Sequence, residues 1–481
     1  MNIWWIVGLS VCTVLTAILV FRVHAFLTLL LAGLLVATLT GQSALQTYAS
    51  QQVDAKKMTS AQAESFVAKS TPAGRLAVEF GVTAGKIGIL IALASIIGQC
   101  LLESGGAATI VDRMLKLTGP RFAPEAMAAS SFVLGIPVFF DTVFYLMVPL
   151  ARSLREKVGK NYTLFILAIL AGGSLAHSLI PPTPGPLLVA EKLNIELGVM
   201  LTAGFAICIC SSVVALVAAR IINHFIDVPL RSVEGPSETR QLAGQADDAA
   251  KPDLMSALLP IAIPVVLITV ASVFKIATKP EAGAQPVEPS ILSNVILFLG
   301  DKNVALGIGA ILAMRLALFI PKGKRESIIT RSLASGGIII LITAAGGAFG
   351  AMLRQAGIGG AIESLTGDVR PLWILPIAFA VTATIRTLQG SATVAMITAV
   401  GIFQGFADAG TLPFHPVYLA MAIGSGSKPV SWMTDSAFWV ITRMSGMTES
   451  EGLKTLAPMS SSMGIAGLFF TLLFAYLFPC V

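Results

Sequence analysis

The sequence is short of charged residues. Only 12% of its 481 residues are Asp, Glu, Lys or Arg, whereas a soluble domain carries about 25%. Hydrophobic residues make up 55%, and the mean hydropathy is +0.83. These values exclude a soluble globular protein and predict an all-α polytopic membrane protein in a lipid bilayer. The basic residues behind the net charge of +6 lie mainly in short loops between apolar spans, which indicates a cytoplasmic loop bias and no nucleic-acid partner.

Cysteines and enzyme motifs are also scarce. The five cysteines lack the spacing of a metal site and are best interpreted as small apolar filler. The sequence contains no GxSxG, HExxH or CxxC motif. We therefore expect no metal, no cofactor and no enzymatic activity, which makes a membrane-embedded enzyme the weaker alternative to a transporter. The cysteines are Cys12, Cys100, Cys208, Cys210 and Cys480.

Apolar segments recur along the whole chain. The first, after MNIWW, lacks a preceding basic region, which indicates a retained helix and not a cleaved signal. The polar stretch 41–79 is expected to be an external loop, partly helical, and 227–253 a polar cytoplasmic linker. The expected apolar spans and blocks are 3–21, 25–40, 85–102, 123–150, 162–195, 198–219, 254–274, 291–320, 334–353, 371–406, 417–441 and 457–479.

Two of these blocks cannot be simple spans. The block 123–150 is too long for one crossing of about 20 residues and too short for two. Basic residues flank both of its ends, so it is predicted to be a re-entrant hairpin with its tip at 135–142. The block 162–195 contains four prolines and a glycine within 181–186, which break a helix. Freed backbone groups are not tolerated against lipid, so this break is predicted to line a protein-enclosed cavity.

The two halves of the chain resemble each other. A displacement of 252 aligns Gly85, Gly98 and Gly105 with Gly337, Gly350 and Gly357. The order of span, hairpin and broken helix also repeats, and the basic loops fall on opposite sides of the two copies. We therefore predict two inverted repeats. The first is 1–226, with scaffold helices in 1–84 and a hairpin and broken helix in 123–195; the linker is 227–253; the second is 254–481, with a hairpin at 371–406 and a broken helix at 417–441.

Ionisable residues at membrane depth are costly and indicate function. Here they fall at the irregular elements: Asp141, His177, Arg386, Lys428 and Asp435. Each has a structural alternative, since Asp141 can cap a helix, His177 can be a hydrogen-bonded core residue, and Lys428 and Asp435 can pair with each other. Arg386 is a natural anion anchor, because its planar fork matches a carboxylate. Asp141, His177 and Asp435 are the proton-coupling candidates.

Hydroxyl and amide groups crowd the same places, which suits a polyhydroxylated anion. Any single serine among them can instead satisfy a helix carbonyl. Bound sodium, held by broken-helix carbonyls, is an alternative to the proton as coupling ion. The predicted substrate-binding residues are Asp141, Thr142, His177, Ser178, Thr183, Arg386, Gln389, Gly390, Ser391, Thr393, Ser425, Ser427, Lys428 and Asp435, with Ser174, Thr434 and Ser436 as further hydroxyls.

Several motifs resemble those of the gluconate:H+ symporter (gluconate permease) family, a branch of the ion-transporter superfamily. They are GKIGILIALASIIGQCLLESGGA (85–107), GIPVFFDTVFYLMVPLA (135–151), HSLIPPTPGP (177–186), GSATVA (390–395) and TDSAFW (434–439). The resemblance implies a multi-pass importer of the bacterial inner (cytoplasmic) membrane that couples a sugar acid to protons, with a mobile domain sliding against a scaffold as in an elevator.

The chain departs from the family pattern at the expected site, with Asp141 in place of Glu, Thr183 in place of a second His, and Thr434-Asp435 in place of Asn-Asp. The substrate is therefore expected to be gluconate or a related small hydroxylated carboxylate. Sodium-coupled carboxylate uptake is the alternative within transport, and a channel is less favoured because paired broken-helix sites suit alternating access. A homo-oligomer is also expected.

Overall fold

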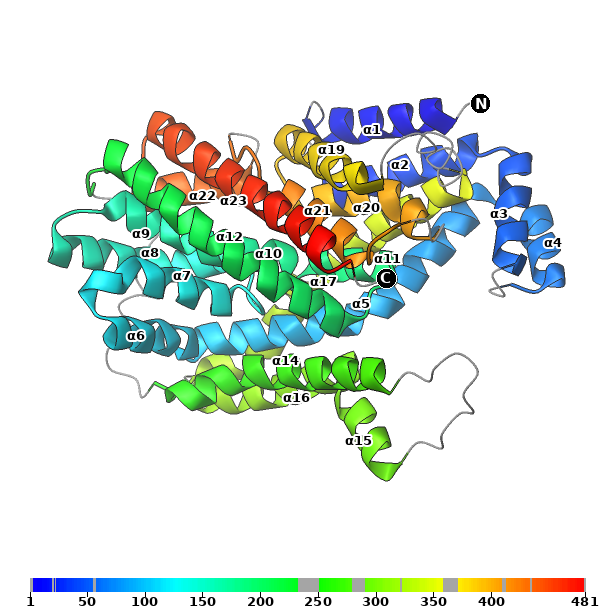
Figure 1. Ribbon diagram of the computed structural model, residues 1–481. Helices are drawn as coiled ribbons and strands as arrows, with labels where there is room; N and C mark the ends of the chain where they lie inside the picture. Colours follow the sequence, from blue (N-terminus) through cyan, green and yellow to red (C-terminus); the bar gives the residue numbers. More distant parts are fainter. Residues whose placement is uncertain are drawn as a thin grey trace.

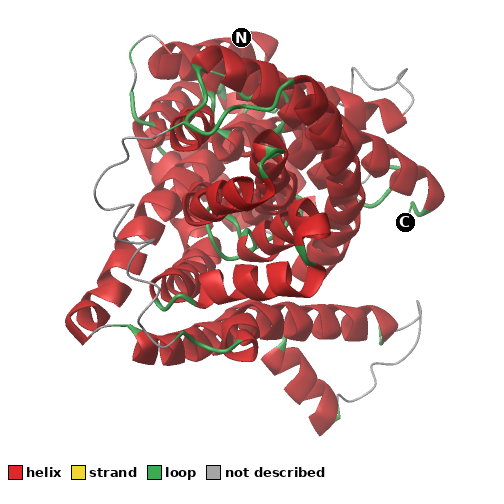
Figure 2. Ribbon diagram, turned by 90° about the vertical axis from the view of Figure 1, so that its left-hand side faces the viewer, coloured by secondary structure: helices red, strands yellow, loops and turns green. Residues whose placement is uncertain are grey.

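A computed structural model describes residues 3–19, 21, 23–54, 58–231, 251–278, 290–320, 322–357, 371–408, 412–432 and 435–479. These residues form helices joined by turns, and none of them forms a β-strand (Figures 1 and 2). Within this part, seven helices are long and apolar enough to cross a membrane, or up to eight if the bent pair α2 (Ala25–Leu39) and α3 (Gln42–Asp54) is one span. The fold is the all-helical, multi-pass architecture that the composition predicts.

The third predicted span starts earlier than expected. Helix α5 (Pro72–Glu103) begins well before Gly85, because Thr71 caps it by accepting the N–H of Gly74 at 3.0 Å, and a proline occupies its first position. The polar stretch before it contains α3 and α4 (Ser60–Lys69), which pack on each other. Most of the polar stretch is therefore helical.

Two long helices pack against each other along their length. Helix α5 packs along α17 (Lys322–Gln355), and α2 lies against both. The buried guanidinium of Arg75 joins all three, because it donates to Oε1 of Gln355 at 3.0 Å and to the carbonyl of Ala37 at 2.8 Å. Of these helices, only α2 lies wholly within 1–84, the range predicted for scaffold helices, and that assignment stays a prediction.

A second layer lies on the outer side of α5 (Figure 1). It consists of α14 (Leu254–Ala277) packed on α16 (Lys302–Arg315), with α15 (Ile291–Leu299) projecting away from the body. The remaining peripheral elements are α1 (Ile3–Leu19), α6 (Gly106–Thr118) and the 3-10 turns Pro120–Phe122, Leu316–Phe319 and Pro371–Trp373.

Two helix pairs occupy the positions of the predicted hairpins. Helices α7 (Ala123–Leu134) and α8 (Phe140–Val158) are joined by the turn 135–139. Helices α19 (Ile374–Gln389) and α20 (Ala392–Asp408) are joined at Gly390, whose φ of +85° is accessible to glycine without strain. Their re-entrant placement in a membrane stays a prediction.

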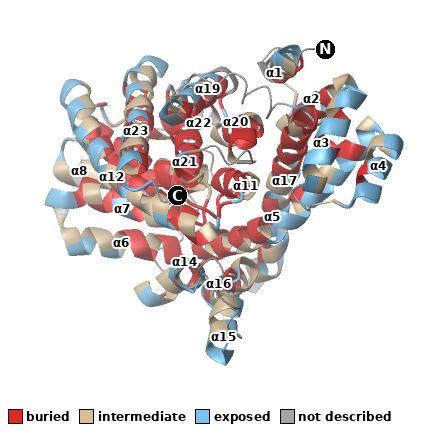
Figure 3. Cartoon of the chain, turned by 45° about the vertical axis from the view of Figure 1, so that its right-hand side comes forward, coloured by how far each residue is buried: buried red, intermediate tan, exposed pale blue. Residues whose placement is uncertain are grey.

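Two helices are interrupted inside the protein. The first consists of α9 (Tyr162–Ile169), a π-helical turn (Leu170–Ser174) and α10 (Leu175–Leu179), and resumes after the proline cluster as α11 (Pro184–Lys192). All residues of α9 and nearly all of α10 are buried, and Figure 3 shows α11 in the same buried interior. The proline break therefore lies inside the protein, as the cost of exposing backbone groups to lipid requires.

The second interruption follows the same plan. Helix α21 (Val417–Gly426) is entirely buried, and the chain resumes as α22 (Ser436–Ser445). Helices α12 (Leu197–Phe225) and α23 (Glu449–Leu477) then close the two halves; each has 29 residues, their starts differ by 252, and they pack together. The order of elements thus repeats. The inversion of the copies and the boundaries 1–226, 227–253 and 254–481 stay predictions, and most of the linker lies outside the described residues.

Candidate functional site

In the first broken helix, the π-helical turn Leu170–Ser174 is in close contact with α7. The Ser131 hydroxyl donates to the carbonyl of Ile169 at 2.9 Å and accepts the N–H of Gly173 at 3.0 Å, so it replaces helical hydrogen bonds within the π-helical turn. Gly172 permits the approach, because a Cβ there would lie 1.9 Å from the carbonyl oxygen of Ala128. This backbone contact fixes the turn that leads into α10 and the proline cluster.

A cavity of about 220 Å³ lies where both hairpin turns meet both broken helices. Its walls come from the start of α8, the π-helical turn, α10, the α19–α20 turn, the segment after α21, α22 and α23. This volume is smaller than the ~300–1,000 Å³ of sites for drug-sized ligands, so the cavity suits a small solute. The predicted site residues that line it are Asp141, His177, Arg386, Gly390, Ser391, Thr393, Ser427, Lys428 and Asp435.

Arg386 and Asp435 form a buried ion pair in the wall of the cavity. Arg386 Nη2 donates to Oδ2 of Asp435, and the two residues are 5% and 4% exposed. The guanidinium also donates from Nε to the carbonyl of Ser427 at 3.1 Å and from Nη1 to that of Gly390. The carboxylate of Asp435 accepts from the hydroxyl of Ser431 and caps α22. The pair therefore joins the second hairpin turn to the second helix break.

Lys428 belongs to the second half of the chain, and its hydrogen-bond partner Ser174 belongs to the first. Its Nζ donates to the carbonyl of Ser174 at 2.9 Å and to the hydroxyl of Ser174 at 3.0 Å. It does not pair with Asp435, so the structural alternative of a Lys428–Asp435 ion pair is wrong; Asp435 pairs with Arg386. Both halves thus contribute to one polar cluster.

Asp141 and His177 face the same cavity without strong partners. Asp141 lies in the first turn of α8, but the N-cap is Phe139 and no side chain caps this helix. The capping alternative for Asp141 is therefore not observed. Nδ1 of His177 is buried without a hydrogen-bond partner, and its ring lies edge-on to Phe139 with centroids 6.2 Å apart. Within the described residues, no hydrogen bond or ion pair engages the Asp141 carboxylate.

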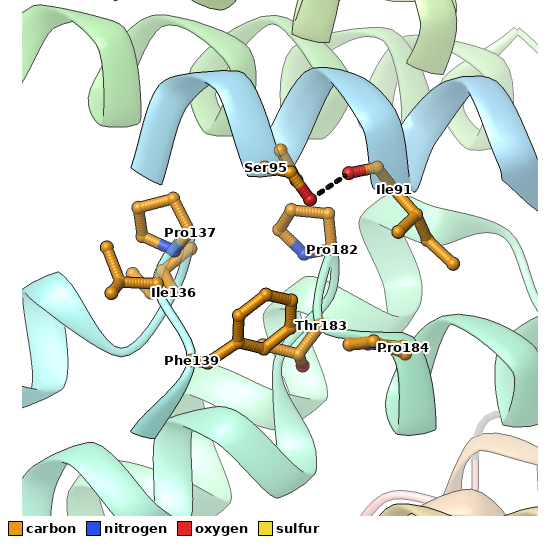
Figure 4. A pocket seen from close by; sticks show the side chains of 10 residues that line it. Ile91, Ser95, Ile136, Pro137, Phe139, Pro182, Thr183 and Pro184 are labelled. Atoms are coloured by element: carbon orange, nitrogen blue, oxygen red, sulfur yellow. Dashed lines mark hydrogen bonds between the residues drawn. The ribbon is translucent and has the colours of Figure 1, made fainter. Parts of the chain in front are cut away.

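A much smaller void of about 10 Å³ lies behind the cavity, between α5, the turn 135–139 and the proline cluster. Figure 4 shows its lining, in which Pro137 and Pro182 face α5 and the hydroxyl of Ser95 donates to Ile91 of its own helix at 2.8 Å. Its size allows at most a water molecule. Thr183 lies here, and its hydroxyl donates to the carbonyl of Ile180 at 2.6 Å.

The remaining predicted ligands lie away from the cavity. Thr142, Ser178 and Ser425 do not line it, and the hydroxyls of Ser178 and Ser425 are buried without partners. The side chain of Gln389 lies outside what the structure describes. As substrate ligands, these residues stay predictions.

The cavity also includes residues that sequence reasoning missed. Ser460 and Met463 reach it from α23, and Phe139 and Ser431 complete its wall. A signal for Ser460 was present in the run of three serines at 460–462 within an apolar span. Met463 and Phe139 carried no such signal, because apolar residues are unremarkable in a membrane helix.

Helix breaks and hairpin turns that enclose a polar cavity within a multi-span helical protein define the class of secondary transporters. Residues 68–477 match the sequence profile of the GntP family permeases, and the chain belongs to this family. It is a transporter of the gluconate permease family and not an enzyme, and it is a multi-pass protein of the bacterial inner membrane.

The chain is similar to several curated proteins over most of their length. An uncharacterized permease of Haemophilus influenzae is 30% identical over 484 residues, covering 96% of this chain and 91% of that protein. The low-affinity gluconate transporter of Escherichia coli (strain K12) is 28% identical over 409 residues, covering 80% and 84%. The gluconate permease of Pseudomonas aeruginosa is 28% identical over 404 residues, covering 82% and 85%.

Two solved transporter structures share the fold. The YdaH transporter of Alcanivorax borkumensis has a TM-score of 0.58 at 14% identity, covering 84% of this chain and 88% of that one. Neisseria gonorrhoeae MtrF has a TM-score of 0.55 at 15% identity, covering 89% and 86%. At these identities the similarity concerns the fold alone.

Proposed function

We propose that this permease is a proton-coupled symporter of gluconate or a related small hydroxylated carboxylate. The observation that supports this most is the cavity of about 220 Å³, in which carboxylates, cations and hydroxyls from both halves converge. Relatives named as gluconate transporters support the substrate class.

The cavity has the groups that a hydroxylated anion requires. Lys428 supplies positive charge, whereas the charge of Arg386 is paired with Asp435, and the hydroxyls of Ser391, Thr393 and Ser460 lie in the same wall. A substrate with several hydroxyls needs both donors and acceptors, and serine and threonine hydroxyls serve as either.

Asp141 is the best placed of the three proton-coupling candidates. Asp435 is already engaged by Arg386, Ser431 and the N–H of Ala437. The carboxylate of Asp141 faces the cavity without such partners, so a proton can bind there without breaking a structural contact. Protonation also removes a charge that would be costly to move through a membrane. His177, with a free Nδ1, is a second position for a proton.

The test is uptake of labelled gluconate by liposomes that contain the purified protein. An imposed pH gradient, acidic outside, should drive accumulation, and an inward sodium gradient at equal pH should not. The Asp141→Asn variant should lose accumulation driven by pH but keep exchange of labelled for unlabelled gluconate. Asp112→Asn, the same change on α6 outside the cavity, should behave like the wild type. Accumulation that requires sodium, or that persists in Asp141→Asn, contradicts the proposal.

A further inference from the structure

Lys428 is a buried cation without an acidic partner in the described part of the chain. Its side chain is in the wall of the cavity, the residue is 6% exposed, and its Nζ contacts only neutral oxygens of Ser174. A buried ammonium group is normally paired with an acid, because desolvation of an isolated charge is expensive. Here the ammonium group is held at the cavity surface by two dipoles, where an incoming anion can reach it.

The local fold provides the contacts that hold Lys428 in the cavity wall. Lys428 follows the C-terminus of α21, where the last carbonyls carry partial negative charge. The carbonyl of Ser174 ends the π-helical turn and is directed at Nζ across the cavity wall. These contacts orient the ammonium group, and neither of them comes from a carboxylate. Of the two basic residues of the cavity wall, Lys428 is therefore the one that forms no ion pair within the described residues.

Arg386, the other cation of the cavity, is placed differently. Its Nε, Nη1 and Nη2 already donate to the carbonyl of Ser427, the carbonyl of Gly390 and the carboxylate of Asp435. Two of the five N–H donors of Arg386 are left by these contacts, but its charge is already neutralised by Asp435, so an anion there would compete with that carboxylate. Binding at Lys428 breaks no ion pair, so an anion gains more free energy there.

Among the described residues, the charges that face the cavity come from four of its surrounding segments. They are Asp141 on α8, Arg386 on α19, Lys428 after α21 and Asp435 before α22, with His177 on α10 as a further titratable group. Arg386 and Asp435 cancel each other, which leaves Asp141 and Lys428. When Asp141 is protonated, one positive charge remains, and one carboxylate neutralises it. A second carboxylate would have no cation to meet.

We propose that Lys428 is the ion-pair partner of the substrate's carboxylate and makes the cavity selective for monocarboxylates over dicarboxylates and uncharged polyols. This inference rests on the proposed function and specifies its substrate class. It assigns Arg386 and Asp435 a positioning role that joins the second hairpin turn to the second helix break.

Three ligands of the same chain length test the selectivity: gluconate, its dicarboxylate analogue glucarate and its uncharged analogue glucitol. Their affinities are measured by calorimetry on the purified wild-type protein. Gluconate should bind at least about tenfold more tightly than glucarate, which corresponds to about 1.4 kcal/mol, because the second carboxylate of glucarate meets no unpaired cation; glucitol should not bind. Equal or tighter binding of glucarate overturns the proposal.

Variants of Lys428 test the residue itself. Lys428→Gln should weaken gluconate binding by about 30-fold or more, as expected for truncation of one partner of a buried charge pair. Lys428→Arg should keep the preference for gluconate over glucitol, because it retains the charge. Lys116→Gln, the same substitution on the exposed face of α6, should leave all affinities unchanged. Unchanged gluconate affinity in Lys428→Gln overturns the proposal.

The outcomes separate this proposal from the proposed function. If the wild-type protein binds none of the three ligands, the sugar-acid function itself fails. If it binds gluconate and Lys428→Gln binds it equally well, only the role of Lys428 fails. Should Lys428→Gln not fold, Lys428→Arg still decides, because loss of its preference for gluconate over glucitol contradicts a charge-based role.

Discussion

The pairing of Arg386 with Asp435 shows what a single residue's sequence context can and cannot reveal. Both residues stand out in the sequence because charges in apolar runs are costly, and both line the cavity. Their partnership was not predictable, because they lie 49 positions apart on elements whose packing depends on the whole fold. Sequence reasoning instead offered Lys428 as the partner of Asp435. Charge alone does not determine whether Asp435 pairs with Arg386 or with Lys428. The position of the second hairpin turn, which holds Arg386 beside Asp435, determines it.

The ion pair makes a stability prediction. Asp435→Asn should lower the unfolding free energy by about 3 kcal/mol or more, because it leaves the Arg386 charge buried without its partner. The double variant Arg386→Gln/Asp435→Asn should recover part of that loss, since neither charge remains. The midpoint of thermal unfolding in detergent measures both. If the loss of stability in the double variant equals the sum of the losses in Asp435→Asn alone and Arg386→Gln alone, the two residues do not stabilise each other.

At the scale of elements, the proline cluster and the long apolar blocks were sufficient to predict both helix interruptions and both helix pairs. Pro181 to Pro186 cannot continue a helix, so the break had to fall there. The π-helical turn before it was not predictable, because it arises from the contact of α7 with Gly172 and from the hydroxyl of Ser131. Thr71 and Pro72 are typical helix-start residues and could have indicated the early start of α5. The prediction used only the apolar pattern, which begins at Gly85.

The close contact of Gly172 with α7 can be tested by replacing this glycine with alanine. Gly172→Ala would place a Cβ 1.9 Å from the backbone oxygen of Ala128, which cannot move without shifting α7. The variant should unfold several degrees below the wild type and lose transport, because the π-helical turn leads directly to the cavity. Gly81→Ala on α5 is the control: no atom lies within 4 Å of its Cβ, so it should be neutral or slightly stabilising. Equal melting temperatures for the two variants would contradict the tight contact.

At the scale of the whole molecule, two halves contribute to one site. Lys428 from the second half donates to Ser174 from the first, and the cavity lies between elements of both. The multi-pass helical fold followed from composition, and the family followed from short polar motifs that span both halves. The sliding of a mobile domain against a scaffold, the inverted orientation of the repeats and a homo-oligomeric assembly remain predictions.

The most direct test of the central claim is a cryo-electron microscopy map of the protein with bound gluconate at acidic pH. The account predicts ligand density in the cavity between the two hairpin turns, with the carboxylate within 4 Å of Lys428 Nζ and with Arg386 still paired to Asp435. Density that lies elsewhere in the molecule, or a carboxylate that displaces Asp435 from Arg386, would contradict it.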